Sequence, residues 1–262
     1  MSKYDLVFAN PLMNAAGTLG FAPASHDTQA LSGLGAFVTD PLSLGARTPA
    51  HGPRCLPYPG GFLLHTGYPN PGLNTALRRH AARWARASQP VIVHLLVQKV
   101  EDLSWMLPRL ERLEGLGGLE VGLPPEVDAS AAVAFARAAA GELPVIVRLP
   151  FEQAVQLAPA VVEAGAAAIS LSPPRGTLLV ANKSGSPHLV EGRLYGPSVY
   201  PLALAAVRAI TARGLPVIGA GGIYTVEQAR AMLASGALAV QLDGIIWKEG
   251  LQIWNCWKSM LA

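Results

Sequence analysis

The chain has 262 residues, of which 51% are hydrophobic and 14% are charged, and its formal net charge is +3. This composition supports a sizeable core and argues against a disordered chain. The N-terminal sequence has no apolar signal segment, and no run of about 18 apolar residues occurs, so we expect neither export nor a membrane span. Cys55 and Cys256 match neither a metal-ligand spacing nor a disulfide framework. We therefore expect no metal site and a cytoplasmic location.

The densest positive charge lies in the stretch RRHAARWAR, Arg78 to Arg86. Clustered arginines with an aromatic residue can bind nucleic acid, but they also occur on a solvated helix face. We favour the second interpretation, with Trp84 turned toward the core. No nucleic-acid partner is expected.

Short apolar runs alternate with helical patterns along most of the chain. The predicted strands are Pro11–Ala16, Ala36–Asp40, Val91–Leu96, Gly118–Leu123, Val145–Leu149, Ala167–Ser172, Val217–Gly221 and Ala239–Asp243. The predicted helices are Leu73–Ala87, Val100–Leu113, Pro125–Ala140, Glu152–Ala164, Pro201–Arg213, Val226–Ser235 and a closing helix, Lys248–Leu261.

Strands that are apolar along their whole length indicate a parallel sheet covered by helices. Eight such units in 262 residues predict a single-domain (β/α)8 TIM barrel over residues 1–262. An open doubly wound sheet is the alternative, although no GxGxxG motif opens the first strand-to-helix turn. Loop excursions at about 41–71 and 173–201 follow predicted strand ends. We therefore expect both excursions to lie over the mouth of the barrel.

Glycines follow the last two predicted strands, in VIGAGGI (217–223) and in LDGII (242–246). TIM barrels place ligands at the carboxyl ends of their strands, and a phosphate often binds there to backbone N–H groups. The pattern predicts an anion site at Gly221, Gly222 and Gly244. A tight turn without a ligand is the alternative. The ligand on this interpretation is any phosphorylated metabolite or flavin mononucleotide.

Several segments resemble, in order, the dihydroorotate dehydrogenase family, especially its soluble class 1 members. They are NPLMNAAGTLGF, the excursion GAFVTDPLSLGARTPAHGPRCLPYPGGFLLHTGYPNPGL, LPVIVRLP, GRLYGPSVYPLAL and VIGAGGIYTVEQARAMLASGALAVQLDGIIWKEG. The resemblance implies an FMN-dependent oxidoreductase of pyrimidine biosynthesis, acting on a small-molecule substrate and forming a homodimer. It implies that FMN contacts the residues Ala15, Ala16, Gly17, Arg148, Gly196, Gly221, Gly222 and Gly244.

The sequence departs from the family pattern at the residues that carry the chemistry. The class 1 segment N-x-S-C-P-N contains a cysteine base, and here Leu123 takes its position. Glu120 and Pro125 replace the two asparagines of that segment, and Asp40 replaces a lysine after the second strand. Leucine has no proton to exchange, so we do not expect dihydroorotate oxidation by the family mechanism.

Three residues near the expected site have two interpretations each. His94 ends the third strand and is the candidate replacement base, although a lone histidine is more often a packed residue. Arg148 stands where the family has a flavin-contacting lysine, and an ion pair with Glu120 is the alternative. Asp243 replaces a glycine. Its carboxylate either repels the phosphate or turns outward and caps the next turn, leaving the Gly244 N–H free.

These observations leave three functions open. The first is a dihydroorotate dehydrogenase-like, FMN-dependent oxidoreductase with weakened or altered substrate chemistry. The second is a non-catalytic barrel that binds flavin or phosphate. The third is an unrelated phosphate-handling barrel enzyme. The sequence specifies neither the substrate nor the electron acceptor.

Overall fold

The computed structural model describes residues 6–24, 30–181 and 187–261, without the side chains of Ala30, Asn255, Cys256 and Leu261. Our interpretations of Cys256 and of the first five residues therefore lie outside the described residues. In the described part of the chain, no helix is long and apolar enough to cross a membrane.

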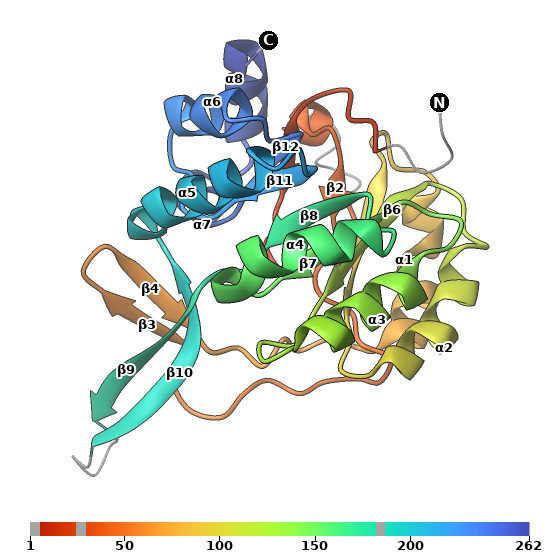
Figure 1. The fold of residues 1–262 in the computed structure, drawn as a ribbon, viewed down its shortest axis with the longest axis horizontal. Helices are drawn as coiled ribbons and strands as arrows, with labels where there is room; N and C mark the ends of the chain where they lie inside the picture. The colour runs from red at the N-terminus through yellow and green to blue at the C-terminus, as the bar shows by residue number, and fades with distance from the viewer. Residues whose placement is uncertain (1–5, 25–29, 182–186, 262) are drawn as a thin grey trace.

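Eight parallel strands form the main sheet, in the order β1-β12-β11-β8-β7-β6-β5-β2 (Figure 1). A parallel bridge between Met13 and Ala36 joins its two ends, which completes the barrel. The predicted (β/α)8 fold and all eight predicted strands are confirmed. The strands are β1 Leu12–Asn14, β2 Phe37–Val38, β5 Val91–Leu96, β6 Leu116–Gly122, β7 Val145–Leu149, β8 Ala168–Leu171, β11 Val217–Ala220 and β12 Ala239–Leu242.

Helices follow the strands around the outside of the barrel. The α-helices are α1 Leu73–Trp84, α2 Val100–Leu110, α3 Ala129–Ala139, α4 Ala154–Glu163, α5 Tyr200–Thr211, α6 Val226–Ala234, α7 Gly244–Glu249 and α8 Ile253–Leu261. Three short 3-10 helices are η1 Ala30–Gly33, η2 Phe151–Gln153 and η3 Pro197–Val199. The prediction of one closing helix is wrong. Gly250 has a φ of 74°, a conformation that suits glycine and ends α7 three residues before α8 begins.

The basic cluster behaves as a solvated helix face. Trp84 is fully buried, and its indole N–H donates to the Phe21 carbonyl over 2.8 Å. Arg78, Arg79 and Arg83 are exposed on the same helix. The prediction that Trp84 faces the core is confirmed.

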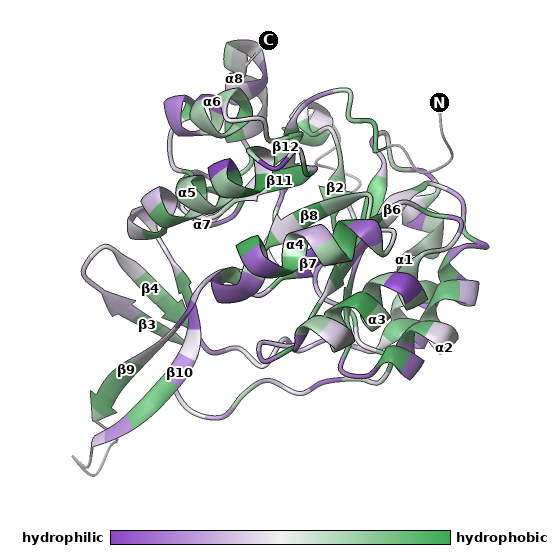
Figure 2. Cartoon of the chain, viewed as in Figure 1, coloured by the Kyte–Doolittle hydropathy of each residue, from purple (hydrophilic) through white to green (hydrophobic). Residues whose placement is uncertain are grey.

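The barrel strands are buried on both faces. One set of side chains fills the interior of the barrel, and the other packs against the helices, which are hydrophobic on one side and hydrophilic on the other (Figure 2). Full burial of one Val or Ile side chain contributes about 1.5–3 kcal/mol of transfer free energy. The interior set consists of Met13, Ala16, Ala36, Val38, Ile92, Ile146, Ala168, Ile218 and Ala239.

The two excursions contain four strands that the sequence analysis did not predict. They are β3 Cys55–Tyr58, β4 Gly61–Leu64, β9 Arg175–Ala181 and β10 Pro187–Tyr195, paired antiparallel in the order β3-β4-β10-β9. Figure 1 shows this second sheet beside the barrel, with β9 and β10 projecting away from it. It brings residues of both excursions together at the barrel mouth.

Candidate functional site

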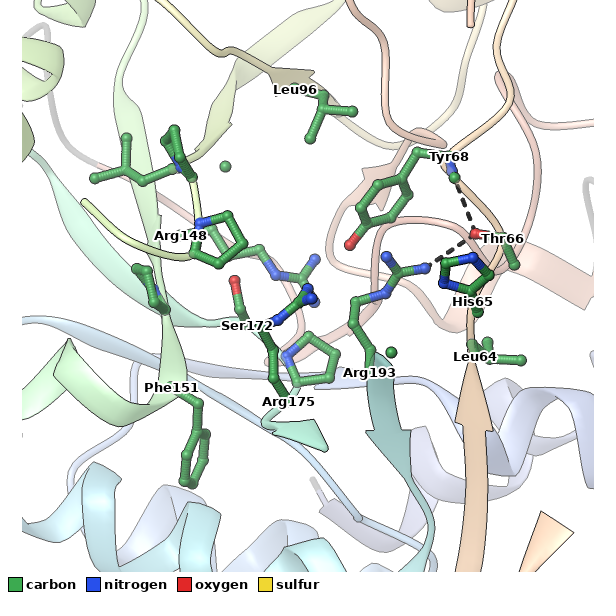
Figure 3. A pocket seen from close by; sticks show the side chains of 18 of the residues that line it. Leu64, His65, Thr66, Tyr68, Leu96, Arg148, Phe151, Ser172, Arg175 and Arg193 are labelled. Atoms are coloured by element: carbon green, nitrogen blue, oxygen red, sulfur yellow. Dashed lines mark hydrogen bonds between the residues drawn. The ribbon is translucent and has the colours of Figure 1, made fainter. Parts of the chain in front are cut away.

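A cavity of about 380 Å³ lies at the carboxyl ends of β5, β6, β7 and β8 (Figure 3). Barrel residues form its floor, and the second sheet with the loop after β4 forms its other walls. The predicted residues among its lining are His94, Leu123, Pro125 and Arg148. Residues that the sequence analysis did not assign include Thr66, Tyr68, Gly122, Ser172, Arg175, Glu191 and Arg193.

Glu120 is the centre of a buried polar network beneath this cavity. Its Oε2 lies 2.6 Å from His94 Nδ1 and 3.5 Å from Arg148 Nη1. Its Oε1 accepts from the Ser170 hydroxyl and from the Gln241 side-chain amide, both over 2.7 Å. The parallel register explains the cluster, because His94 lies opposite Glu120 and Arg148 lies opposite Ser170. The ion pair between Glu120 and Arg148, left open by the sequence, is present.

These contacts set the protonation of the network. Burial alone would raise the pKa of Glu120, but the charge of Arg148 and hydrogen bonds from His94 and Ser170 outweigh it and lower that pKa to about 2. Burial lowers the pKa of His94, although Glu120 opposes this. Burial alone would lower the pKa of Arg148, but the charge of Glu120 helps to raise it. An ionised carboxylate therefore faces a neutral imidazole and a permanent cation.

The same contacts fix the tautomer of His94. A carboxylate can only accept, so His94 Nδ1 must carry the proton and Nε2 must carry the lone pair. A Cβ atom on Gly122 would lie 2.9 Å from Nε2, so the glycine leaves the imidazole room beside the cavity wall. No hydrogen bond from another described residue engages Nε2. The arrangement can accept a proton from a molecule in the cavity.

The predicted anion site lies on the other side of the barrel mouth. Gly221 and Gly222 follow β11, and Gly244 follows β12. β12 pairs with β1, which precedes Ala15, Ala16 and Gly17, and β11 pairs with the other edge of β12. Gly196, after β10, also reaches this region, since its carbonyl oxygen would lie 2.8 Å from a Cβ atom on Gly222. The fold therefore brings the predicted glycines together, away from the residues that line the described cavity.

Position 222 requires glycine, because of its backbone conformation and its close neighbours. Its φ is 68°, and a Cβ atom there would collide with the backbone nitrogen of Tyr200. Among the hydrogen bonds of the described residues, none is donated by the backbone N–H of Gly221 or Gly222. These two N–H groups can therefore donate hydrogen bonds to a ligand oxygen.

Asp243 caps the next turn, as the second interpretation of this residue expects, but the rest of that interpretation is wrong. The Asp243 side chain does not turn outward: it is buried, and its Oδ1 accepts from the Gly244 N–H over 2.5 Å. The Gly244 N–H is therefore not free. The Tyr224 hydroxyl lies where a Cβ atom on Gly244 would stand. Burial raises the pKa of Asp243 and raises that of Tyr224 to about 12, with Asp243 contributing to the latter.

Asp40 holds the loop after β1. Its Oδ1 accepts from the Gly20 N–H over 3.1 Å. Burial raises the pKa of Asp40, although hydrogen bonds from Gly20 and Gly17 oppose the shift. The residue that replaces the family's lysine thus binds the backbone beside Gly17.

The fold and the cavity define a TIM-barrel protein with a ligand site at the carboxyl ends of its strands. The family model for dihydroorotate dehydrogenase matches residues 2–261. The catalytic subunit of dihydroorotate dehydrogenase B (NAD(+)) from Pelobacter propionicus is 32% identical over 254 residues, which cover 90% of this chain and 84% of that one. The corresponding subunit from Desulforudis audaxviator is 34% identical over 253 residues, covering 90% and 82%. The chain belongs to the dihydroorotate dehydrogenase family, a family of oxidoreductases.

Members of this family typically use FMN, so the residues present must be compared with what FMN needs. The free N–H groups of Gly221 and Gly222 fit a phosphate group. At Gly17, the only atom near an added Cβ is Pro41 Cδ at 3.9 Å, which leaves that edge open. The Asp243 carboxylate on the Gly244 N–H does not fit, because it adds negative charge where a phosphate oxygen would bind. The residues after β11 therefore fit an FMN phosphate well, and the residues after β12 fit it poorly.

No group of three or more His, Cys, Asp or Glu residues that could hold a metal ion occurs in the part of the chain that the structure describes.

Proposed function

We propose that this chain is an FMN-dependent oxidoreductase of the dihydroorotate dehydrogenase family that acts on a substrate other than dihydroorotate. His94 takes the role of general base in this proposal. The observation that carries it is the 2.6 Å hydrogen bond between His94 Nδ1 and Glu120 at the floor of the cavity. Glu120 is a positioning residue, because it acts on the substrate only through His94.

The geometry supports His94 over Leu123 as the base. Leu123, at the position of the family's base, is 7% exposed, lines the same cavity and has no ionisable group. A neutral histidine with one nitrogen bound to a carboxylate presents its other nitrogen as a base, as in hydrolase triads. Removing a proton from the substrate at Nε2 would leave an imidazolium that Glu120 stabilises. The buried network thus supplies both orientation and charge compensation.

The proposal assigns the flavin to the other side of the mouth. Gly221 and Gly222 would hold its phosphate, and Ala15, Ala16, Gly17 and Gly196 would border the remainder. Gly244 would bind the phosphate only if the Asp243 carboxylate released the Gly244 N–H. Arg148 would supply a fixed positive charge near the ring while it remains paired with Glu120. FMN, when bound, supplies a two-electron acceptor.

A second candidate is a non-catalytic barrel that binds an anion without redox chemistry. The observation that favours it is the buried Asp243 carboxylate on the Gly244 N–H, with Tyr224 beside it. This candidate needs only the fold and the cavity.

The test begins with the absorbance spectrum of the purified protein and a titration with FMN. The proposal predicts bound flavin or binding below tens of micromolar, the range of ordinary cofactor affinities. It also predicts that His94→Asn slows flavin reduction by an active substrate about 10²- to 10⁴-fold, with FMN affinity unchanged. Absence of FMN binding at these concentrations would favour the second candidate.

We also propose a homodimer and a cytoplasmic location, which the resemblance and the cysteine usage respectively suggest. Light scattering of the purified protein at micromolar concentration tests the dimer. A mass equal to one chain contradicts it.

A further inference from the structure

The loop after β4 contains a strained residue that faces the cavity. Tyr68 has a φ of 52°, and it is the one non-glycine residue with positive φ in the described part of the chain. A bulky residue in this conformation costs free energy, and such residues cluster at ligand sites. The conformation places the Tyr68 ring 3.6 Å from the guanidinium carbon of Arg193. Figure 3 shows Tyr68 and Arg193 on the same side of the cavity.

Arg193 is held firmly but is not neutralised. Its Nη2 donates to Thr66 Oγ1 over 3.0 Å, and that oxygen also accepts from the Tyr68 N–H. Its Nε is buried without a hydrogen-bond partner. No described carboxylate forms an ion pair with it. A half-buried guanidinium that no carboxylate neutralises keeps its positive charge available to an anion in the cavity.

Arg47 is anchored beside it in the same way. It lines the cavity, and its Nε donates to the Gly67 carbonyl over 3.1 Å. No described carboxylate pairs with Arg47 either. Two half-buried arginines are thus fixed on adjacent residues of one loop, Thr66 and Gly67.

The other two arginines of the cavity already have acidic partners. Arg148 pairs with Glu120, and Arg175 Nη2 lies 3.6 Å from Glu191 Oε2. Of the four arginines that line the cavity, two therefore remain without a carboxylate. Figure 3 shows Arg148, Arg175 and Arg193 pointing into the cavity.

We propose that this cavity binds a small dianion, with its acidic groups at Arg47 and Arg193. The chemical class is a short dicarboxylate or a phosphate monoester, since both present two negative charges to forked guanidinium groups. The inference concerns the substrate class of the cavity in the proposed function, but it requires no FMN. It therefore survives if the protein binds no flavin.

Calorimetric titration of the FMN-free protein at low salt tests the proposal, with succinate, inorganic phosphate and the monoanion orotate as probes. We expect succinate or phosphate to bind at least about tenfold more tightly than orotate. Arg193→Gln should weaken dianion binding about 10- to 100-fold, the loss expected for a charge-assisted hydrogen bond. Arg47→Gln should act in the same direction. Arg208→Gln, which removes an exposed arginine of α5, should change nothing.

The selectivity between dianion and monoanion separates binding from folding. If Arg193→Gln only disturbed the fold, all three affinities would fall together and their ratio would not change. The proposal requires the ratio of succinate or phosphate affinity to orotate affinity to fall toward one. A preference for succinate identifies the dicarboxylate, and a preference for phosphate identifies the monoester.

Three outcomes overturn the proposal. They are no binding of either dianion at millimolar concentration, equal effects of Arg193→Gln and Arg208→Gln, and phosphate binding that Arg193→Gln leaves intact. The last outcome would place phosphate at the Gly221 and Gly222 N–H groups instead.

Discussion

The two sides of the barrel mouth differ in how they meet a ligand. The cavity half, at the carboxyl ends of β5 to β8, is open and lined by charged side chains. The glycine half, at the ends of β11, β12 and β1, is partly closed by the chain itself. There the Asp243 carboxylate occupies the Gly244 N–H, and Tyr224 lies against Gly244. The same fold thus keeps one half available and restricts the other.

The comparison shows how differently two anion sites can change. A site built of backbone N–H groups is weakened when a nearby residue becomes a carboxylate, because here the Asp243 carboxylate binds the Gly244 N–H itself. A site built of arginines changes its ligand when their number and pairing change. Arg148 connects the two halves: it pairs with Glu120, and its charge also acts on Asp243.

The largest stability effect is expected at the network under the cavity half. Glu120→Ala would leave Arg148 buried without an anion and leave His94, Ser170 and Gln241 without their common acceptor. We expect a loss of about 3–5 kcal/mol in the free energy of unfolding, measured by urea denaturation. The control is Glu191→Ala, which breaks the exposed pair with Arg175 and should cost about 0–1 kcal/mol. Equal losses of unfolding free energy in the two variants would show that the Glu120 network does not stabilise the cavity half.

The pH dependence of stability should report the same carboxylate. The folded-state pKa of Glu120 is about 2, below the ordinary value of 4.5. Its stabilising contribution is therefore complete above about pH 4.5 and is lost as the pH falls toward 2. The difference in unfolding free energy between the wild type and Glu120→Ala should narrow over that interval. A difference that stays constant from pH 5 to pH 2 would contradict the assignment.

Opening the glycine half should raise its affinity for FMN. Asp243→Gly removes a carboxylate and frees the Gly244 N–H. Two unit charges about 4 Å apart repel by about 4 kcal/mol at an effective dielectric of 20, so an affinity gain of tenfold or more is expected. Quenching of FMN fluorescence measures it.

Two controls sharpen this result. Glu126→Gln removes an exposed carboxylate elsewhere and should not change FMN affinity. If Asp243→Gly binds FMN no better than the wild type while Tyr224→Ala does, the Tyr224 side chain closes the glycine half, and the electrostatic explanation is wrong.

The smallest effect is expected at the helix that supports the glycine half. Thr225 caps α6 by accepting from the Gln228 N–H, and Gln228 in turn accepts from the Tyr224 N–H over 2.7 Å. Thr225→Ala should cost about 1 kcal/mol in unfolding free energy. Succinate or phosphate binding in the cavity half should not change by calorimetry. A parallel loss of cavity binding would mean that the two halves are not independent.

The barrel was predictable because its strands are apolar on both faces and recur with helices between them. The polar network could also have been found, since His94, Glu120 and Arg148 each interrupt an apolar strand run with one polar residue. The second sheet was not predictable in this way. In β9, for example, the apolar residues Leu178, Leu179 and Val180 are consecutive and Leu179 is 69% exposed, so the sequence does not show the alternation of sides that the strand has.

The side-chain events at Gly244 could not be predicted from the sequence. The capping of its N–H by Asp243 depends on a buried side-chain orientation, and the contact with Tyr224 depends on how two loops meet. Likewise, the unpaired state of Arg193 follows only from the pairing of β10 with its neighbours, because that pairing decides which carboxylates come near.

Anaerobic mixing of the protein, saturated with FMN, with dihydroorotate tests the central claim most directly. Dihydroorotate oxidation requires a base placed where Leu123 now stands, and His94 lies on a neighbouring strand. The account predicts that the yellow flavin band persists, with bleaching at least about 10² slower than in a family member that has the cysteine base. Fast bleaching would contradict the claim that dihydroorotate is not the substrate. If the rate were also unchanged in His94→Asn, the role of His94 as base would be contradicted as well.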